Sequence, residues 1–391
     1  MDDLMSAVAE SLAEDDVNGA WRHVQGAAQS DVETARLLVA LAEAAVGKWH
    51  PHLAGLARRA AFEPCNPDRL ASLASALVES GDAPMAAALY GRALALRPED
   101  PRLLADRIAA LERSGEHGEA LRLLRERPEM VVGDGVLSYL YAFHLALSGD
   151  LVGASGVAFD HAPQAAFLRA RIDGILARGE ALGVATARAR LATITGVLAM
   201  RVSDEEVVEE PPQTAEILAR MRGALQAFEV QPEAVSFLAT LGSEPLAGVV
   251  SERLGVPMEP FNPSTTRSGL LVIFDLCDVS PERARSLRER RDLVIYAHLA
   301  SSRREHELAP DLLGTYAQNI RFEQPPDDGF SAFDVSPEPF RQAVPRHPKL
   351  IDDPLAARWA AVPPGAGRWR ARRDRLWAGF SGASTLAMVP V

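Results

Sequence analysis

The sequence predicts two folds in one chain, an array of helical repeats followed by a small α/β domain with a parallel sheet. Gly47, Gly81, Gly115 and Gly149 recur at a strict spacing of 34 residues, which is typical of a repeat array. Beyond residue 233, short apolar runs alternate with helical patterns, as they do around parallel strands. Residues 201–213 separate the two regions and hold five acids and two prolines.

Composition narrows the classes of protein that are possible. The 391 residues carry 41 Lys+Arg against 53 Asp+Glu, a formal net charge of −12, which speaks against a general nucleic-acid or anionic-membrane binder. Cys65 and Cys277 are too few for a disulfide scaffold or a multi-cysteine zinc site. The N-terminus is acidic, and no apolar run is long enough to span a bilayer. We therefore expect a bacterial cytoplasmic protein with no membrane span and no multi-cysteine zinc site.

Each predicted repeat is a pair of helices, and residues 67–100 show this best. The first helix has an apolar face, the turn at Ser80-Gly81-Asp82 breaks it, and Pro98 ends the second helix. The apolar positions are Leu70, Leu73, Ala74 and Leu77 in the first helix, and Ala86, Tyr90 and Ala93 in the second. A hairpin of this kind needs its neighbours to cover its apolar face.

This pattern resembles the tetratricopeptide repeat (TPR) family over about residues 33–168. In that span His52 replaces a small residue in the first unit, and the last unit has no closing proline. The resemblance implies a TPR-like α-solenoid over 1–200, with capping helices at about 2–28 and 162–198, and a concave groove that binds a peptide or a partner helix. We place eight small or apolar residues in this groove: Leu37, Leu41, Ala71, Ser75, Ala105, Ala109, Tyr139 and Phe143. Such a groove suits an amphipathic helix, from a partner or from this chain's own second half.

The acidic stretch at 201–213 is predicted to be a solvated linker, and a domain at 214–323 follows it. We expect a helix at 214–228 and strands at 234–241, 270–276 and 292–299, with an extended piece at 256–261. Helices are expected from Ser243 to Arg253, from Ser280 to Arg291 and from Ser301 to Glu307. Strand, helix and strand in this order predict a Rossmann-like parallel sheet.

Ligands of open parallel sheets bind where strands end and helices begin. The residues at these ends form a possible ligand crevice: Gly242, Ser243, Asp275, Asp278, His298, Ser301, Ser302, Arg303 and Arg304. They suit a phosphate, a ribose or a metal, with His298 as a base. The same residue types also cap helices and close turns in proteins without a ligand. Glycine-rich nucleotide loops, a nucleophile elbow and a zinc-protease motif are absent from the sequence, so we assign no catalytic residue, no metal ligand and no cofactor.

The tail at 324–391 combines a proline-rich segment, predicted to be irregular, with a basic aromatic stretch at 368–380. Residues 341–380 carry nine basic and three acidic residues, a net charge of +6, which leaves −18 on the rest of the chain. A segment like this contacts nucleic acid or a membrane in some proteins. Here the charge imbalance favours contact with the acidic body of the same chain or with a protein partner.

These observations predict a non-catalytic adaptor or assembly scaffold that binds a partner helix or peptide in the repeat groove. The alternative is a transferase with a nucleotide-sugar or phosphoribosyl donor in the α/β crevice. Residues 240–257 are similar to phosphoribosyltransferase segments, and TPR arrays also occur fused to nucleotide-sugar glycosyltransferases. Both similarities rest more on the fold than on a site. The sequence leaves the partner and the oligomeric state open.

Overall fold

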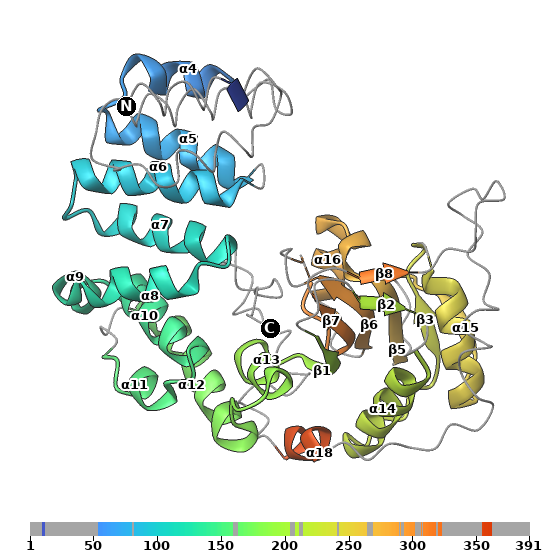
Figure 1. Ribbon diagram of the computed structural model, residues 1–391. Helices are drawn as coiled ribbons and strands as arrows, with labels where there is room; N and C mark the ends of the chain where they lie inside the picture. The colour runs from blue at the N-terminus through green and yellow to red at the C-terminus, as the bar shows by residue number, and fades with distance from the viewer. Residues whose placement is uncertain are drawn as a thin grey trace. The chain divides into compact units, whose positions relative to one another are not determined.

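The computed structural model combines helical hairpins with a parallel sheet (Figure 1). The residues that it describes are 10–11, 54–79, 82–158, 163–203, 208–210, 214–240, 242–263, 269–288, 290, 293–301, 306, 308–317, 320–322 and 354–361. The chain divides into two compact units. Unit 1 comprises residues 1–144 and 156–168, and unit 2 comprises 145–155 and 169–391.

Unit 1 is helical, and its helices follow the predicted hairpins. They are α4 (Ala54–Phe62), α5 (Pro67–Glu79), α6 (Ala83–Leu96), α7 (Pro101–Arg113), α8 (His117–Arg125), α9 (Pro128–Gly133) and most of α10 (Gly135–Leu147). Helix α5 packs against α6, and α6 packs against α7 (Figure 1). The apolar face predicted for 67–100 is confirmed, because Leu70, Leu73, Ala74 and Leu77 are all buried.

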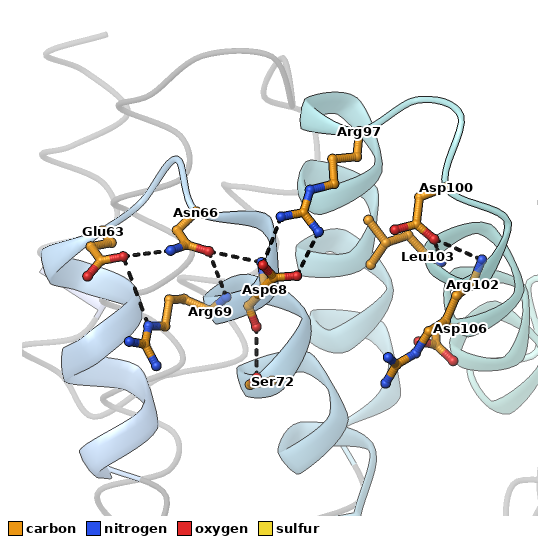
Figure 2. Close-up of polar contacts among 10 residues, drawn as sticks. All are labelled: Glu63, Asn66, Asp68, Arg69, Ser72, Arg97, Asp100, Arg102, Leu103 and Asp106. Carbon is orange, nitrogen blue, oxygen red and sulfur yellow. Dashed lines mark hydrogen bonds and ion pairs between the residues drawn. The ribbon is translucent and has the colours of Figure 1, made fainter.

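The first helices of successive hairpins begin in the same way, 34 residues apart. Asn66 Oδ1 accepts hydrogen bonds from the Asp68 and Arg69 amides. Asp100 does the same for Arg102 and Leu103, and Asp134 for Val136 and Leu137. Figure 2 shows the first two of these caps. An N-cap side chain satisfies amides that lack a partner within the helix, so each repeat defines its own helix start locally.

Figure 2 also shows an ion pair between the two ends of one hairpin. The Arg97 guanidinium at the end of α6 donates two hydrogen bonds, of 2.7 and 2.8 Å, to the Asp68 carboxylate in the first turn of α5. This pairing lowers the pKa of Asp68. Both side chains are exposed, and ion pairs at a surface contribute little to stability. The pair therefore fixes the orientation of two side chains more than it stabilises the fold.

The turns within the hairpins repeat as well. The amides of Asp82, Glu116 and Asp150 donate to the carbonyls of Leu77, Leu111 and Leu145 at 2.8 to 2.9 Å. This bond closes a helix around a left-handed residue, and Gly115 and Gly149 have φ values of +79° and +91°. Gly183 continues the spacing with φ +74° between α12 (Pro163–Leu182) and α13 (Ala187–Thr195). The period thus extends into the segment that we expected only to cap the array.

Replacing Asp100 with alanine is expected to lower the free energy of unfolding of unit 1 by about 1 kcal/mol, because two amides of α7 lose their acceptor. Urea denaturation followed by circular dichroism measures the change. The neighbouring substitution Glu99→Ala removes an exposed carboxylate that caps no helix and is the control. Equal effects of the two substitutions would contradict the role of the cap.

Unit 2 is an α/β unit. Its further elements are α11 (Leu151–Ser155), β1 (Leu198–Val202), β2 (Val208–Glu210), α14 (Thr214–Ala227), β3 (Val235–Phe237), α15 (Ser243–Leu254), β4 (Met258–Pro260), β5 (Gly269–Asp275), the 3₁₀ turn η2 (Leu276–Asp278), α16 (Pro281–Arg288), β6 (Leu293–Ser301), β7 (Leu312–Ala317), β8 (Ile320–Phe322) and α18 (Pro354–Ala360). The six-stranded sheet has the order β1-β7-β6-β5-β3-β4 and is parallel throughout.

Strands β3 and β5 are parallel neighbours in the sheet, and the direction in which the chain adds further strands reverses between them. From β3 the chain passes through α15 to β4 on one side, whereas from β5 it passes through α16 to β6 on the other side. Helix α15 lies beside β3 and β5 (Figure 1). Right-handed connections that run in opposite directions leave the sheet on opposite faces. The carboxyl ends of β3 and β5 therefore form the topological switch point of the sheet.

Several segments differ from the predictions. The predicted linker at 201–213 contains the end of β1, and β2 pairs in parallel with β8. Ser301 ends β6 and His306 forms an isolated bridge, where a helix from Ser301 to Glu307 was expected. The proline-rich segment, predicted to be irregular, contains helix α18. Its Leu355 and Ala356 join the core between α14, α15 and the sheet. The basic aromatic stretch at 368–380 lies outside the described residues.

Candidate functional site

The residues predicted to line the repeat groove separate into two groups. On α5 and α7, Ser75 and Ala109 are exposed and Ala71 and Ala105 are half-buried. On α10, by contrast, Tyr139 and Phe143 are 3% and 1% exposed, and their rings stack within unit 1. The two aromatic side chains are therefore core residues and do not line a surface. Leu37 and Leu41 lie outside the described residues.

The accessible residues of the predicted groove belong to one exposed stripe on each of the helices α5 and α7. On α5 the stripe runs through Asp68, Ala71, Ser72 and Ser75, and on α7 through Arg102, Ala105, Asp106, Ala109 and Arg113. We call these nine residues the α5–α7 face. Positions three and four apart share one side of a helix. The opposite stripes, which include Leu70 and Leu104, are buried. The face is thus small and polar, whereas the sequence predicted a small and apolar groove.

One side chain of α6 links the two helices of this face. The Tyr90 hydroxyl shares a hydrogen bond with Ser75 on α5. It also lies close enough to Asp106 on α7 for the charge of that carboxylate to affect its pKa. Burial, followed by the charge of Asp106, raises the pKa of Tyr90 to about 12. Tyr90 therefore stays neutral at physiological pH and holds Ser75 in place.

Asp106 is the half-buried acid of the α5–α7 face. Burial raises its pKa, while Arg102, 3.9 Å away, lowers it and Asp100 raises it further. The Arg102 side chain is 90% exposed, so solvent screens most of its attraction. The carboxylate of Asp106 is thus partly desolvated and is attractive to a further cation.

At the carboxyl end of β3, Gly242 and Ser243 serve the fold. Ser243 is fully buried. Its hydroxyl accepts a hydrogen bond from the Phe274 amide at 2.9 Å and shares another, of 2.7 Å, with Thr240. Gly242 has φ +74°, and a Cβ there would lie 2.7 Å from the Phe274 ring. Both residues therefore attach the start of α15 to β5, and the Ser243 hydroxyl is used within the fold.

His298 is also a core residue. It is fully buried, its Nδ1 lies 2.7 Å from the Tyr296 hydroxyl, and its ring stacks on Phe274 at a centroid distance of 5.9 Å. Burial lowers the pKa of His298 to about 3. A side chain without access to solvent does not reach a substrate, so the predicted role as a base has no support from this geometry.

The end of β5 is more open. Asp275 Oδ1 accepts a hydrogen bond from the Cys277 amide at 2.8 Å and so caps η2, while Asp278 is exposed. Although the residue is exposed, partial desolvation of its carboxyl, followed by the charge of Asp275, raises the pKa of Asp278. Ser301 contributes its backbone carbonyl, which lies 2.8 Å from His306 Nε2. Ser302, Arg303 and Arg304 lie outside the described residues.

Two residues at this edge were not among the predicted site residues. Cys277 lies between Asp275 and Asp278, and its Sγ is 4.0 Å from His306 Nδ1. Cys277 was close to a predicted strand end and could have been included on that ground. Nothing in the sequence indicates His306, because 29 residues and strand β6 separate it from Cys277.

Together, these features define a protein with a 34-residue helical hairpin unit and a six-stranded parallel α/β unit. No family model matches the chain, and no curated protein matches it significantly. Among the described residues, no helix is both long and apolar enough to cross a membrane. The same part of the chain contains no group of three or more His, Cys, Asp or Glu side chains arranged to hold a metal ion.

Proposed function

We propose that this protein is a non-catalytic adaptor, a scaffold whose TPR-like hairpins bind a helical segment of another protein across the α5–α7 face. One observation carries the proposal. Equivalent positions of successive hairpins, 71 with 105 and 75 with 109, are all small and all at least partly accessible. Small side chains at matching positions leave room for the backbone of a partner along both helices.

The polar residues of the face suggest the chemistry of the partner. Because Asp106 is partly desolvated, an Arg or Lys of the partner would compensate its charge. Ser72 and Ser75 add hydroxyl groups beside it. We therefore expect a partner helix with small side chains on its contacting side and one basic residue, not the strongly hydrophobic helix that the sequence suggested.

The alternative, a transferase with a nucleotide-sugar or phosphoribosyl donor, has less support. The switch point between β3 and β5 is where a parallel sheet would hold such a donor. However, the Ser243 hydroxyl is hydrogen-bonded to the Phe274 amide, and His298 lies within the core. Two of the residues that would contact the donor thus have structural roles.

Introducing bulk on the α5–α7 face tests the adaptor function. The double substitution Ala105→Arg/Ala109→Arg is expected to abolish retention of a specific partner, because two long side chains would fill the space beside α7. Affinity purification of the tagged full chain from cells that produce it naturally, with quantitative mass spectrometry, measures retention. Ala95→Arg, at an exposed alanine of α6, is the matched control.

A protein that the wild type and Ala95→Arg retain equally, and that the double variant loses, supports the proposal. Asp106→Asn is then expected to weaken the same complex about tenfold, since a charged hydrogen bond is worth roughly 1.5–3 kcal/mol. If no protein distinguishes the double variant from the control, the α5–α7 face is not the binding surface.

A further inference from the structure

Cys277 is an exposed thiol at the carboxyl end of a central strand. Strand β5 ends at Asp275, whose carboxylate accepts a hydrogen bond from the Cys277 amide and so stabilises the turn η2. The position of the thiol is therefore set by the end of a buried strand and by one hydrogen bond. Cys65, the other cysteine of the chain, is also exposed and lies between α4 and α5 in the other unit.

The imidazole beside Cys277 is almost completely buried. His306 is 2% exposed, and its Nε2 lies 2.8 Å from the carbonyl oxygen of Ser301, the last residue of β6. A carbonyl oxygen only accepts hydrogen bonds, so Nε2 carries the proton of the neutral ring. Nδ1 then presents its lone pair, and Cys277 Sγ lies 4.0 Å from it. The buried imidazole of His306 is thus oriented by the backbone of β6, and its basic nitrogen faces the exposed thiol of Cys277.

We propose that Cys277 is a reactive thiol of this protein, with His306 as its proton acceptor, and that it forms mixed disulfides with small disulfides. A nucleophile, an adjacent base and a third group that orients the base are the arrangement that activates cysteine. Here these parts are the Cys277 thiol, His306 Nδ1 and the Ser301 carbonyl. The site is independent of the α5–α7 face, which belongs to unit 1.

The reaction is a thiol–disulfide exchange. Cys277 transfers its proton to His306 Nδ1, and the thiolate attacks one sulfur of the disulfide. The disulfide bond breaks as the new bond to Cys277 forms, so the Cys277 sulfur is oxidised and the departing sulfur is reduced. The leaving thiolate takes the proton from His306, and the imidazole returns to its neutral form.

The charges around the thiol select among disulfides. Asp275 and Asp278 flank Cys277, and Asp278 is exposed. Two carboxylates repel an anionic disulfide and attract a cationic one. The reaction partner is therefore a small cationic or neutral disulfide, and cystamine, which carries two ammonium groups, is a suitable probe.

The test compares the two cysteines within the full chain. Cys65→Ser leaves only Cys277, and Cys277→Ser leaves only Cys65. With cystamine at about pH 6.5, we expect Cys277 to form the mixed disulfide about tenfold faster than Cys65, measured by intact mass, because a positioned base accelerates proton removal. Adding His306→Gln to Cys65→Ser is expected to remove this advantage. The glutamine amide can still donate to the Ser301 carbonyl, but it offers no base to the thiol.

Equal rates for Cys65 and Cys277, or an unchanged Cys277 rate after His306→Gln, would overturn the proposal. If His306→Gln does not fold, the pH dependence of the Cys65→Ser variant decides. The Cys277 rate is expected to fall less steeply than the Cys65 rate between about pH 8 and pH 6.5. Parallel profiles would show that His306 does not act on the thiol.

Discussion

Lowering the pH from about 7 to 5 is expected to reduce the free energy of unfolding of each unit by about 2 kcal/mol. Each unit contains a buried histidine whose pKa is strongly lowered, His144 in unit 1 and His298 in unit 2. Burial lowers the pKa of both side chains to about 3, from 6.5 in an unfolded chain. Below pH 6.5 the unfolded state therefore binds a proton that the folded state binds only near pH 3, so stability falls across this window and is fully present above it.

The neighbours of the two histidines do not reverse this sign. Glu112 Oε2 lies 3.9 Å from His144 Nε2 and would favour a charged ring. Burial is the larger effect, and His117, with a ring centroid 5.7 Å away, lowers the pKa further. For His298, burial is the cause of the lowered pKa, and its ring shares a hydrogen bond of 2.7 Å with the Tyr296 hydroxyl. Both sites thus favour the neutral form.

Urea denaturation at several pH values measures this effect, and histidine substitutions assign it. His298→Gln and His144→Gln each change stability at neutral pH, but the informative quantity is the difference between pH 7 and pH 5. Each substitution is expected to reduce that difference by about 2 kcal/mol in its own unit. A pH dependence that is the same with and without the histidine would contradict the prediction.

Substituting Gly314 with alanine is expected to destabilise unit 2 by about 3 kcal/mol, the upper end of the range for overpacked cores. Gly314 lies in β7, which pairs with β6 on one side and β1 on the other. A Cβ at this position would collide with the carbonyl oxygen of His298 and would lie 3.0 Å from the Tyr296 hydroxyl. The obstacle is backbone of a central strand, which does not move without disturbing the sheet.

Gly248 in α15 is the matched control. A Cβ there would meet only the Met258 sulfur, 4.0 Å away, and alanine is favoured over glycine inside a helix by about 0.5–1 kcal/mol. Gly248→Ala is therefore expected to be neutral or slightly stabilising. Thermal and urea unfolding of both variants give the comparison. Similar stabilities would show that β7 can move away from β6 at little cost.

Much of the fold could be predicted because its signals are local. The spacing of the glycines led to the hairpins, and the helix at 214–228 agrees with α14 within one residue. The buried runs at 270–276 and 292–299 correspond to β5 and β6 within two residues. The sequence contains two further local signals of the repeat that did not enter the prediction. One is the set of helix-capping side chains at Asn66, Asp100 and Asp134, and the other is Gly183. Each repeats at 34 residues.

The candidate sites were predicted less well, because burial depends on the whole fold. Periodicity placed Tyr139 and Phe143 on the same side of their helix as Ala71 and Ala105 on theirs. In the folded chain only the alanines remain accessible. His298 follows a strand pattern that also suits a catalytic base, yet it lies in the core beside Tyr296. Segments with weak patterns, such as β2 and α18, were missed because their partners are more than 100 residues away in the sequence.

The sequence by itself determined where most of the helices and the central strands β5 and β6 form, since caps, left-handed glycines and apolar runs act within a few residues of the chain. The tertiary structure alone decided the strand order β1-β7-β6-β5-β3-β4, the burial of His144 and His298, and the meeting of Cys277 with His306. The physical reason is that these features depend on which distant segments pack together. That choice is made by the packing and hydrogen bonding of the whole domain, and no short stretch of sequence specifies it.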